Sequence, residues 1–449
     1  MSIFAVQRRK AMLKRKIERE IEQHLSAPSN KILLIDGARQ IGKTYIIRHV
    51  GRKLYPNYVE INLQSDSTGK RLFANVRSID DFYTMLGTFA GNKLRKKENT
   101  LVFLDEIQTY PVFLTLLKFL KDDDRYTYIC SGSLLGVTLM QTPSIPIGSI
   151  ETLQMYPLDF EEFLWANGFA ENTVSFVREQ FDRQQSLDES LHQRMMSLFR
   201  EYLLTGGLPD AINSYLAERN IMKLRRIQNE VHRYYGADAS RYDAEHKLKI
   251  QRVFEMIPSN LENKKKRVVV KDIENKEGKQ FSDYQDEFDY LISSGIALDV
   301  KAISNPKFPL VESARKNLLK LYLNDVGLLT NILYKNNIRP ILEDMPSINL
   351  GSVYESVVAQ ELRAHGHELY YYDNKHRGEV DFLIDDYERL SVLPVEVKSG
   401  KDYKIHVALT HFTGTPDYHI NKGVVLSNER QWQTKGMIVY MPVYFVMFL

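Results

Sequence analysis

The sequence predicts an α/β protein with a parallel sheet in its first part and a second group of strands near its end. Residues 30–150 alternate helical stretches with four short apolar runs, KILLIDG, NYVEINL, TLVFLDE and YTYICSGS. Strands separated by helices favour a parallel sheet that is covered on both faces. The length of 449 residues indicates roughly three domains, each large enough to bury its own core.

The amino-acid composition is that of a soluble globular protein. A hydrophobic content of 43% with 26% charged residues is typical of a soluble globular protein, and a net charge of +3 does not by itself indicate nucleic-acid binding. The lone cysteine, Cys130, excludes a disulfide framework within the chain and favours a reducing compartment. No apolar stretch reaches the ~18 to 20 residues of a membrane span, and the first residues lack the apolar core of a signal peptide. We therefore expect a cytoplasmic protein.

Four segments follow one another along the chain. We expect an α/β core with a basic N-terminal helix at 1–150, a helical segment at 151–240, a winged helix-turn-helix at 241–335 and a second α/β domain at 345–449. The winged helix is predicted from the succession of helix KLKIQRVFEMIPSNL, linker NKKKRVVVKDI, helix FSDYQDEFDYLISSG and strand-like IALDVKAI. The charged helix 8–25 is either a solvated helix packed on the core or an arm that contacts nucleic acid.

A glycine-rich stretch between an apolar strand and a helix predicts a phosphate-binding loop. Residues 37–44, GARQIGKT, satisfy the pattern G-x-x-x-x-G-K-[ST]. The two glycines let the backbone turn its N–H groups toward phosphate oxygens. Lys43 would reach the outer phosphates and Thr44 would ligate magnesium, whereas the alternative is a turn with no ligand. The expected nucleotide-binding residues are Gly37, Ala38, Arg39, Gln40, Ile41, Gly42, Lys43, Thr44, Tyr45 and Ser131.

Two acidic residues follow the third apolar run, TLVFLDE. Its four consecutive apolar residues predict a buried strand, and the carboxyl ends of such strands are where open α/β sheets bind ligands. We expect Asp105 to hold magnesium through water, and Glu106 to act in catalysis by polarising the attacking water. Ser131 or Ser133, at the end of the next strand, could sense the γ-phosphate. A serine at an ordinary strand-to-turn junction is the alternative.

Several motifs, taken in order, resemble one family of ATPases. GARQIGKT, LVFLDEIQ, ICSGSLLG, MYPLDFEEFL and LTGGLPDAI, and later IPSNL, YLISSGIALDV, KLYLNDVGLL, VAQEL, EVDFLI and PVEVKSG, are similar to AAA-type P-loop ATPases of bacteria and archaea that carry a C-terminal domain of uncharacterised function. The resemblance covers nearly the whole chain. It implies a magnesium-dependent ATPase core, a helical lid at 151–240, a winged helix, and a C-terminal domain similar to PD-(D/E)xK restriction-endonuclease-like folds.

One departure from the family pattern concerns the arginine that completes the ATPase site. Gly148-Ser149 stands where many relatives have a basic residue after the glycine. The arginine is therefore unassigned, and the candidates are Arg39 inside the loop and arginines of the lid such as Arg200.

Acidic residues and a lysine share one face of two expected strands near the C-terminus. In EVDF the carboxylates of Glu379 and Asp381 lie on one face, and in PVEVK so do Glu396 and Lys398. Restriction-like nucleases bind magnesium through such carboxylates, while a lysine activates water or stabilises charge at the scissile phosphate. Other E-x-K tripeptides of this chain lie in polar contexts, so the apolar strand distinguishes Glu396 and Lys398.

The resemblance then gives roles to these residues. The expected catalytic residues are Asp381, Glu396 and Lys398, and the expected ligands of magnesium or manganese are Asp381, Glu396 and Glu355 from helix SVYESVVAQEL. Glu379 and Glu361 are weaker alternatives as ligands. Two other interpretations stay open: a surface salt-bridge ladder, or an inactive nuclease-like fold that binds DNA or protein.

A basic run in the expected winged helix is the main candidate for nucleic-acid contact. Lys264-Lys265-Lys266-Arg267, with Lys271 just beyond, would contact phosphates and would not read sequence. A solvated loop is the alternative.

Together these patterns predict a magnesium-dependent protein that binds and hydrolyses ATP, and whose nucleotide state is coupled to a C-terminal nuclease-like domain that acts on or binds nucleic acid. The alternative is a regulatory or signalling ATPase whose C-terminal domain binds DNA or protein without cleavage. A translocating motor on DNA is a third interpretation. No membrane partner is expected, and a homo-oligomer is left open.

Overall fold

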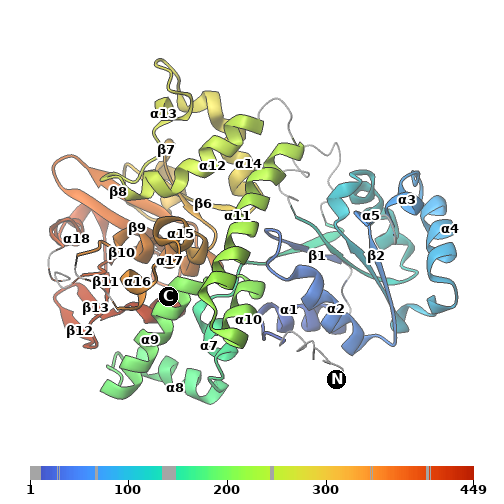
Figure 1. Cartoon of the computed structure of the whole chain (residues 1–449), viewed down its shortest axis with the longest axis horizontal. Coiled ribbons are helices and arrows are strands. Elements are labelled where there is room, and N and C mark those ends of the chain that lie inside the picture. Colours follow the sequence, from blue (N-terminus) through green and yellow to red (C-terminus); the bar gives the residue numbers. More distant parts are fainter. Residues whose placement is uncertain are drawn as a thin grey trace, which may run out of the picture.

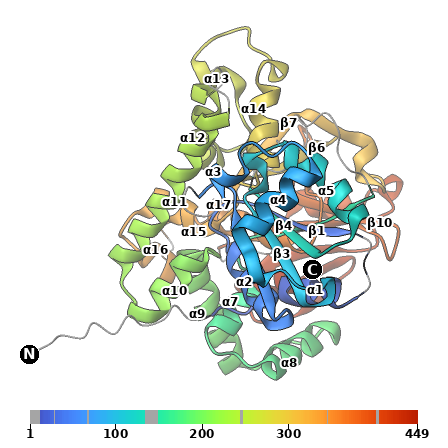
Figure 2. The same ribbon diagram turned by 90° about the vertical axis from the view of Figure 1, so that its right-hand side faces the viewer.

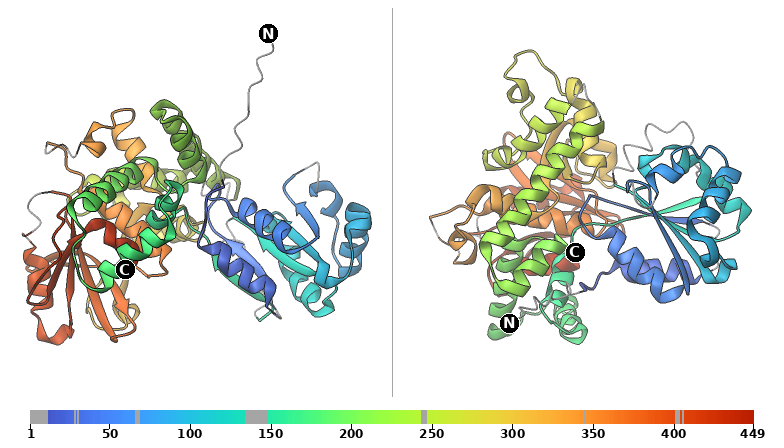
Figure 3. Two further views of the ribbon diagram at one scale, coloured as in Figure 1. Left: turned by 90° about the horizontal axis from the view of Figure 1, so that it is seen from below. Right: turned by 45° about the vertical axis from the view of Figure 1, so that its right-hand side comes forward.

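The chain folds into two lobes with helices between them. The computed structural model describes residues 12–27, 29, 31–65, 69–133, 148–242, 247–343, 345, 347–400, 404 and 406–449. Figure 1 shows the lobe formed by the first part of the chain on the right and the lobe with the C-terminal strands on the left. Seen from below, green helices from the middle of the chain lie between the lobes (Figure 3). The start of the expected N-terminal helix, 8–11, falls outside the described residues.

A five-stranded sheet forms the first lobe, and its strand pairs are parallel. The strands are β1 (Ile32–Asp36), β2 (Asn57–Asn62), β3 (Thr100–Asp105), β4 (Thr127–Ser131) and β5 (Ile150–Gln154). They lie in the order β2-β3-β4-β1-β5. This order confirms the predicted α/β core with a parallel sheet. Strand β5 was missed because its residues IETLQ are mostly polar and none of them is fully buried.

Helices cover both faces of this sheet, as expected for parallel strands. The helices of this lobe are α1 (Ile17–Ser26), α2 (Lys43–Leu54), α3 (Lys70–Phe73), α4 (Ile79–Ala90) and α5 (Val112–Asp123). Alternate residues of β1 enter different cores, because strand side chains alternate between faces. Leu33 packs in the cluster that contains Ile46 of α2, and Leu34 packs in the cluster that contains Leu117 of α5.

The middle of the chain is helical. These helices are α7 (Phe160–Ala166), α8 (Glu171–Asp182), α9 (Glu189–Thr205), α10 (Pro209–Glu218), α11 (Ile221–Tyr242), α12 (Lys247–Glu262), α13 (Val270–Glu274) and α14 (Gln285–Ser293). Figure 2 shows α8 and α13 at opposite ends of this helical part. The later helices are α15 (Val326–Tyr334), α16 (Arg339–Leu342), α17 (Gly351–Ala364) and α18 (Val407–Thr413). None of the helices in the described ranges is both long and apolar enough to cross a bilayer.

Short 3-10 turns connect some of these elements. They are η1 (Gly91–Lys93), η2 (Lys97–Asn99), η3 (Ile107–Thr109), η4 (Phe281–Tyr284), η5 (Leu310–Ser313), η6 (Pro416–Tyr418) and η7 (Val443–Phe448).

The second lobe contains an eight-stranded mixed sheet. Its strands are β6 (Ala297–Ile303), β7 (Ala314–Leu323), β8 (Tyr370–Asn374), β9 (Gly378–Asp386), β10 (Ser391–Val397), β11 (Gly423–Ser427), β12 (Gln433–Lys435) and β13 (Ile438–Pro442). The order is β12-β13-β11-β10-β9-β8-β6-β7. The segment of β6 and β7 is predicted from the sequence to belong to a separate winged helix, but β6 pairs in parallel with β8. Because β6 is buried along nearly its whole length, it needs this neighbour. The winged helix, the restriction-endonuclease-like fold and the four domain boundaries stay predictions.

Gly207, just before α10, packs tightly against the segment between β5 and α7. The N–H of Gly207 donates to the Asp325 carboxylate (2.6 Å), and the N–H of Leu158 donates to the Gly207 carbonyl (2.8 Å). A Cβ at Gly207 would lie 2.1 Å from the carbonyl oxygen of Leu158, which is a backbone atom and cannot rotate away. Residue 207 must therefore be glycine for α10 to begin where it does.

Gly207→Ala is expected to lower the free energy of unfolding by about 1–3 kcal/mol, because the added methyl group overlaps the backbone at Leu158. The matched control is Gly87→Ala in α4, where a Cβ would meet nothing within 4 Å. That change is expected to be neutral or to stabilise by about 0.5–1 kcal/mol. Urea unfolding of both variants measures the difference, and equal effects would show that the packing of Gly207 against Leu158 is not tight.

Candidate functional site

The loop between β1 and α2 has the backbone of a phosphate-binding turn. Gly37 has φ +145° and Gly42 has φ +100°, which side chains with a Cβ rarely adopt. A Cβ at Gly37 would also lie 2.2 Å from the carbonyl oxygen of Met155. Both glycines of the motif are therefore required by the local geometry, and the loop leads directly into the N-terminus of α2.

Lys43 lies folded back over this loop. Its ammonium group donates to the carbonyl oxygens of Gly37 (2.8 Å) and Ala38 (2.7 Å) and is buried. Burial lowers the pKa of Lys43, and the negative charges of Glu106 and Asp36 oppose that shift. A phosphate in the loop would offer this ammonium group an anion in place of two neutral carbonyls.

The residues predicted to share magnesium lie against each other. The Thr44 hydroxyl donates to the two carboxylate oxygens of Asp105, at 3.1 and 3.2 Å. Asn62 also donates to Asp105 (2.8 Å), and so does the Ser131 hydroxyl. Burial raises the pKa of Asp105, and the charge of Glu106 adds to that effect. A hydroxyl and a carboxylate are oxygen ligands of the kind that Mg²⁺ prefers, so Thr44 and Asp105 fit the ion.

Glu106 lies at the turn that follows β3, in a left-handed conformation with φ +58°. Its carboxylate accepts hydrogen bonds from Gln108 (2.5 Å) and from the Ser133 hydroxyl (3.1 Å). Ser131 therefore faces Asp105, whereas Ser133 faces Glu106. The predicted role of a serine as a γ-phosphate sensor is untested, and its place beside Glu106 makes Ser133 the better candidate.

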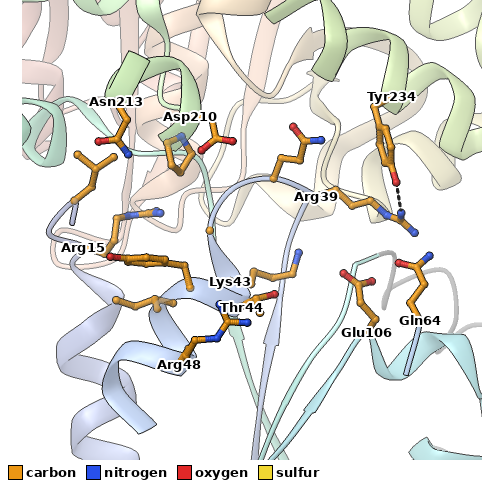
Figure 4. Close-up of a pocket in the computed structure, with 16 residues that line it drawn as sticks. Arg15, Arg39, Lys43, Thr44, Arg48, Gln64, Glu106, Asp210, Asn213 and Tyr234 are labelled. Atoms are coloured by element: carbon orange, nitrogen blue, oxygen red, sulfur yellow. Dashed lines mark hydrogen bonds between the residues drawn. The ribbon is translucent and has the colours of Figure 1, made fainter. Parts of the chain in front are cut away.

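A cavity of about 430 Å³ opens over the loop. Its lining includes the predicted residues Arg39, Gln40, Gly42, Lys43, Thr44, Tyr45 and Glu106. Figure 4 shows Lys43 and Thr44 below the loop, with Glu106 and Gln64 on one side and Asp210 and Asn213 across the cavity. The remaining lining residues were not predicted from the sequence: Leu13, Arg15, Ile46, Arg48, Gln64, Pro209, Asp210, Asn213 and Tyr234. For Pro209, Asp210 and Asn213, the signal in the sequence was the glycine pair of LTGGLPD, which directly precedes the helix α10 that carries them.

Three arginines line the cavity, and Arg200 is not among the described residues that do so. Arg15 precedes α1 and is buried; it donates to the carbonyls of Ile41 (2.9 Å) and Tyr156 (2.7 Å) and to the Glu162 carboxylate (3.0 Å). Arg48 donates to both carboxylate oxygens of Glu60, at 2.8 and 2.5 Å.

The carboxylates predicted for a second site lie together in the C-terminal lobe. Asp381 of β9 accepts a hydrogen bond from the N–H of Val397 (2.8 Å), and Lys398 donates to Glu396 (2.8 Å). Burial raises the pKa of Asp381, and the charges of Glu396 and Glu355 raise it further. We call Glu355, Asp381 and Glu396 the carboxylate cluster. Glu355 and Glu396 are buried and Asp381 is half-buried, and β9 and β10 lie inside the sheet, so these residues do not form a ladder on a surface edge strand.

Part of the basic run that was expected to contact nucleic acid turns inward to this cluster. Lys266 pairs with Glu355, and Arg267 pairs with Asp373. Burial alone would lower the pKa of Lys266, but the charges of Glu355 and Asp381 outweigh it and raise that pKa. Lys264, Lys265 and Lys271 remain exposed.

The alternative ligands Glu379 and Glu361 have other partners. Glu379 pairs with the buried Lys320. Glu361 accepts hydrogen bonds from the N–H of Phe160 (2.9 Å) and the hydroxyl of Tyr202 (3.0 Å). Burial and the nearby charge of Asp159 raise the pKa of Glu361 to about 8. Glu361 thus belongs to the contact between α17 and α7, away from the carboxylate cluster.

Metal-binding geometry is not preformed in the part of the chain that the structure describes. There, no group of three or more His, Cys, Asp or Glu side chains is arranged to hold a metal ion. One observation nevertheless fits a cation: the buried Oε2 atom of Glu396 accepts no hydrogen bond from any described residue. The metal-ligand roles of Glu355, Asp381 and Glu396 stay predictions.

Three parts of the chain match known protein families. Residues 29–164 match the family described as AAA domain. Residues 196–338 and 350–446 match two domains of unknown function, DUF8612 and DUF4143 respectively. No curated protein matches the chain.

Similar solved structures are distant in sequence. The Walker-type ATPase PABY2304 of Pyrococcus abyssi is 14% identical with a TM-score of 0.43, over 72% of this chain and 96% of that one. The Aeropyrum pernix Orc1 protein, solved in complex with DNA, is 14% identical with a TM-score of 0.31, over 75% and 95%. Hsp104 of S. cerevisiae, as an ADP complex, is 12% identical with a TM-score of 0.30, over 64% and 38%.

The family match and the loop geometry agree on the first lobe. Residues 29–164 match the AAA domain family, and within them the loop that carries Lys43 and Thr44 meets Asp105 of β3 at the carboxyl ends of parallel strands, which is the arrangement expected of an AAA-type P-loop domain.

Proposed function

We propose that the protein is a magnesium-dependent ATPase whose nucleotide state is passed to the carboxylate cluster of the C-terminal lobe. The observation that carries this proposal is the position of Arg15. A single buried guanidinium group contacts the phosphate loop at Ile41, the segment before α7 at Tyr156, and the first turn of α7 at Glu162.

The loop residues supply the parts needed for phosphoryl transfer to water. Backbone N–H groups between Gly37 and Thr44 would bind the β- and γ-phosphates, and Lys43 would neutralise them. Bound Mg²⁺, held by Thr44 and Asp105, would supply positive charge at the phosphates. Glu106 would orient the attacking water and accept its proton, and Gln108 and Ser133 hold its carboxylate for this role.

A chain of hydrogen bonds supports the link to the C-terminal lobe. Asp159 and Glu162 form the capping box at the start of α7, and the next N–H, that of Phe160, donates to Glu361 of α17. The same helix carries Glu355 of the carboxylate cluster, about a turn and a half before Glu361. A shift of the phosphate loop that moves Arg15 would therefore act on α17 through α7.

Glu106→Gln is expected to lower kcat for ATP hydrolysis by roughly 100-fold or more, because the carboxylate that accepts the water proton is lost. The Kd for ADP should change little, since Glu106 contacts the water and not the diphosphate. Lys43→Ala is the control, and it should weaken ADP binding instead. Hydrolysis by Glu106→Gln at the wild-type rate would contradict the assignment, as would unchanged binding by Lys43→Ala.

A second candidate function is metal-dependent cleavage of nucleic acid at the carboxylate cluster. Three observations favour it: the charges of Glu396 and Glu355 raise the pKa of Asp381, Lys398 lies beside Glu396, and the buried Oε2 atom of Glu396 accepts no hydrogen bond from any described residue. A magnesium or manganese ion bound by Glu355, Asp381 and Glu396 would have to displace the Lys266 ammonium group from Glu355. The exposed Lys264, Lys265 and Lys271 would then contact DNA phosphates. Without cleavage, the same surface supports a regulatory switch that binds DNA or protein.

With magnesium or manganese, cutting of linear, nicked or branched DNA or of RNA should fall by roughly 100-fold or more in Lys398→Ala and Asp381→Ala, since charge stabilisation or metal binding is lost. Lys375→Ala, at an exposed turn of the same sheet, is the control and should cut normally. Parallel reactions with and without ATP test whether nucleotide controls the cutting. Absence of cutting by the wild type, with DNA binding retained, would reject the nuclease in favour of the switch.

A further inference from the structure

We propose that Arg39, from inside the phosphate loop, is the arginine that stabilises the γ-phosphate during hydrolysis, and that Ser133 and Tyr234 position it. This inference rests on the proposed ATPase function. It assigns the residue that the family pattern left open, and it makes the site complete within one chain.

The guanidinium group of Arg39 lies one hydroxyl group away from the carboxylate that would activate water. Its Nε atom donates to the Ser133 hydroxyl (3.1 Å), and that hydroxyl donates to Glu106 (3.1 Å). Gln108 donates to the same two acceptors, Glu106 at 2.5 Å and Ser133 at 3.0 Å. The attacking water and the γ-phosphate must meet beside Glu106, so this network places the guanidinium group at the reacting end of the nucleotide.

The other end of the guanidinium group is held by the helical segment. Its Nη1 atom donates to the hydroxyl of Tyr234 (3.2 Å), and the guanidinium carbon lies 5.7 Å from the centre of that ring. The hydroxyl of the next residue, Tyr235, donates to the Arg39 carbonyl (2.9 Å). Figure 4 shows Arg39 reaching from the loop toward Tyr234, on the side of the cavity where Glu106 lies. Helix α11 therefore fixes both the backbone and the side chain of Arg39.

The other two arginines of the cavity, Arg15 and Arg48, each form an ion pair with a glutamate. Arg15 binds two carbonyls and Glu162, and Arg48 forms a two-point pair with Glu60. Moving either would separate a carboxylate from its guanidinium partner. The partners of Arg39 include two neutral hydroxyl groups, those of Ser133 and Tyr234, and a charge-assisted hydrogen bond to phosphate is stronger than a neutral one.

The chemical step needs this charge. The water oxygen forms a bond to the γ-phosphorus while the bond from that phosphorus to the bridging oxygen of ADP breaks. The electron pair stays on ADP, and the water proton goes to Glu106. Negative charge grows on the bridging oxygen and is shared by the γ-phosphoryl oxygens. The planar guanidinium of Arg39 offers paired donors to such oxygens.

The test compares Arg39→Ala, Arg39→Lys and Tyr234→Phe in the full-length protein with magnesium. Arg39→Ala should lower kcat by roughly 100-fold or more while the Kd for ADP stays within about 3-fold. It should also fail to retain ADP with aluminium fluoride, which mimics the transferred phosphoryl group, under conditions where the wild type retains it. Arg39→Lys should recover little, because an ammonium group cannot make the two-point contact.

The Tyr234→Phe variant tests whether Tyr234 positions Arg39 for catalysis or only supports the fold. It should lower kcat several-fold with an unchanged KM, and should have no further effect in the Arg39→Ala background, since it acts only through Arg39. Because the arginine comes from the same chain, wild-type turnover per site should not depend on protein concentration.

Three results would overturn the proposal: wild-type kcat in Arg39→Ala, loss of ADP binding together with kcat in that variant, or turnover per site that rises with protein concentration. The last would show that a neighbouring chain supplies the arginine. Failure of the proposed ATPase function looks different, because the wild type itself would then turn over ATP no faster than Lys43→Ala, and the role of Arg39 would fall with it.

Discussion

The contact of Arg15 with the phosphate loop and Glu162 is the interaction on which the arrangement of the two lobes depends. Arg15 and Glu162 are both almost fully buried, and a buried charge is stable only when its partner and hydrogen bonds remain in place. Removing either group leaves an uncompensated charge in the interior. The segment before α1, the loop at Ile41 and the start of α7 are thus held in one geometry.

A second layer of charge extends this contact to the C-terminal lobe. Burial would raise the pKa of Asp159, but His365 and Lys16 outweigh burial and keep that pKa low. Glu361, beside it on α17, has its pKa raised by burial and by the charge of Asp159. The carboxylate of Asp159 therefore stays charged, whereas that of Glu361 binds a proton more readily. Such a set of groups is sensitive to small displacements, because each charge depends on the others.

Sequence reasoning predicted what depends on local pattern and missed what depends on tertiary contacts. Four strands of the first sheet and the turn at Gly37 follow from apolar runs and glycine spacing, whereas the polar strand β5 has neither signal. The carboxylates of Asp381 and Glu396 were placed together because strand side chains alternate. Lys266 was expected outside, but the acidic cluster that attracts it is contributed by β9, β10 and α17, which lie far along the chain. Arg15 could not be distinguished from the other basic residues of its segment without knowing where Ile41 lies.

The central claim is that the nucleotide cavity and α17 are mechanically connected through α7. The most direct measurement is hydrogen–deuterium exchange of the full-length protein, with and without saturating ADP and magnesium. Slower exchange at residues 155–166 and 351–364, in addition to residues 37–45, is the predicted result, because ligand binding stabilises each element that the Arg15 contacts join. Protection confined to the loop and to residues that line the cavity would contradict the connection and leave the two lobes energetically independent.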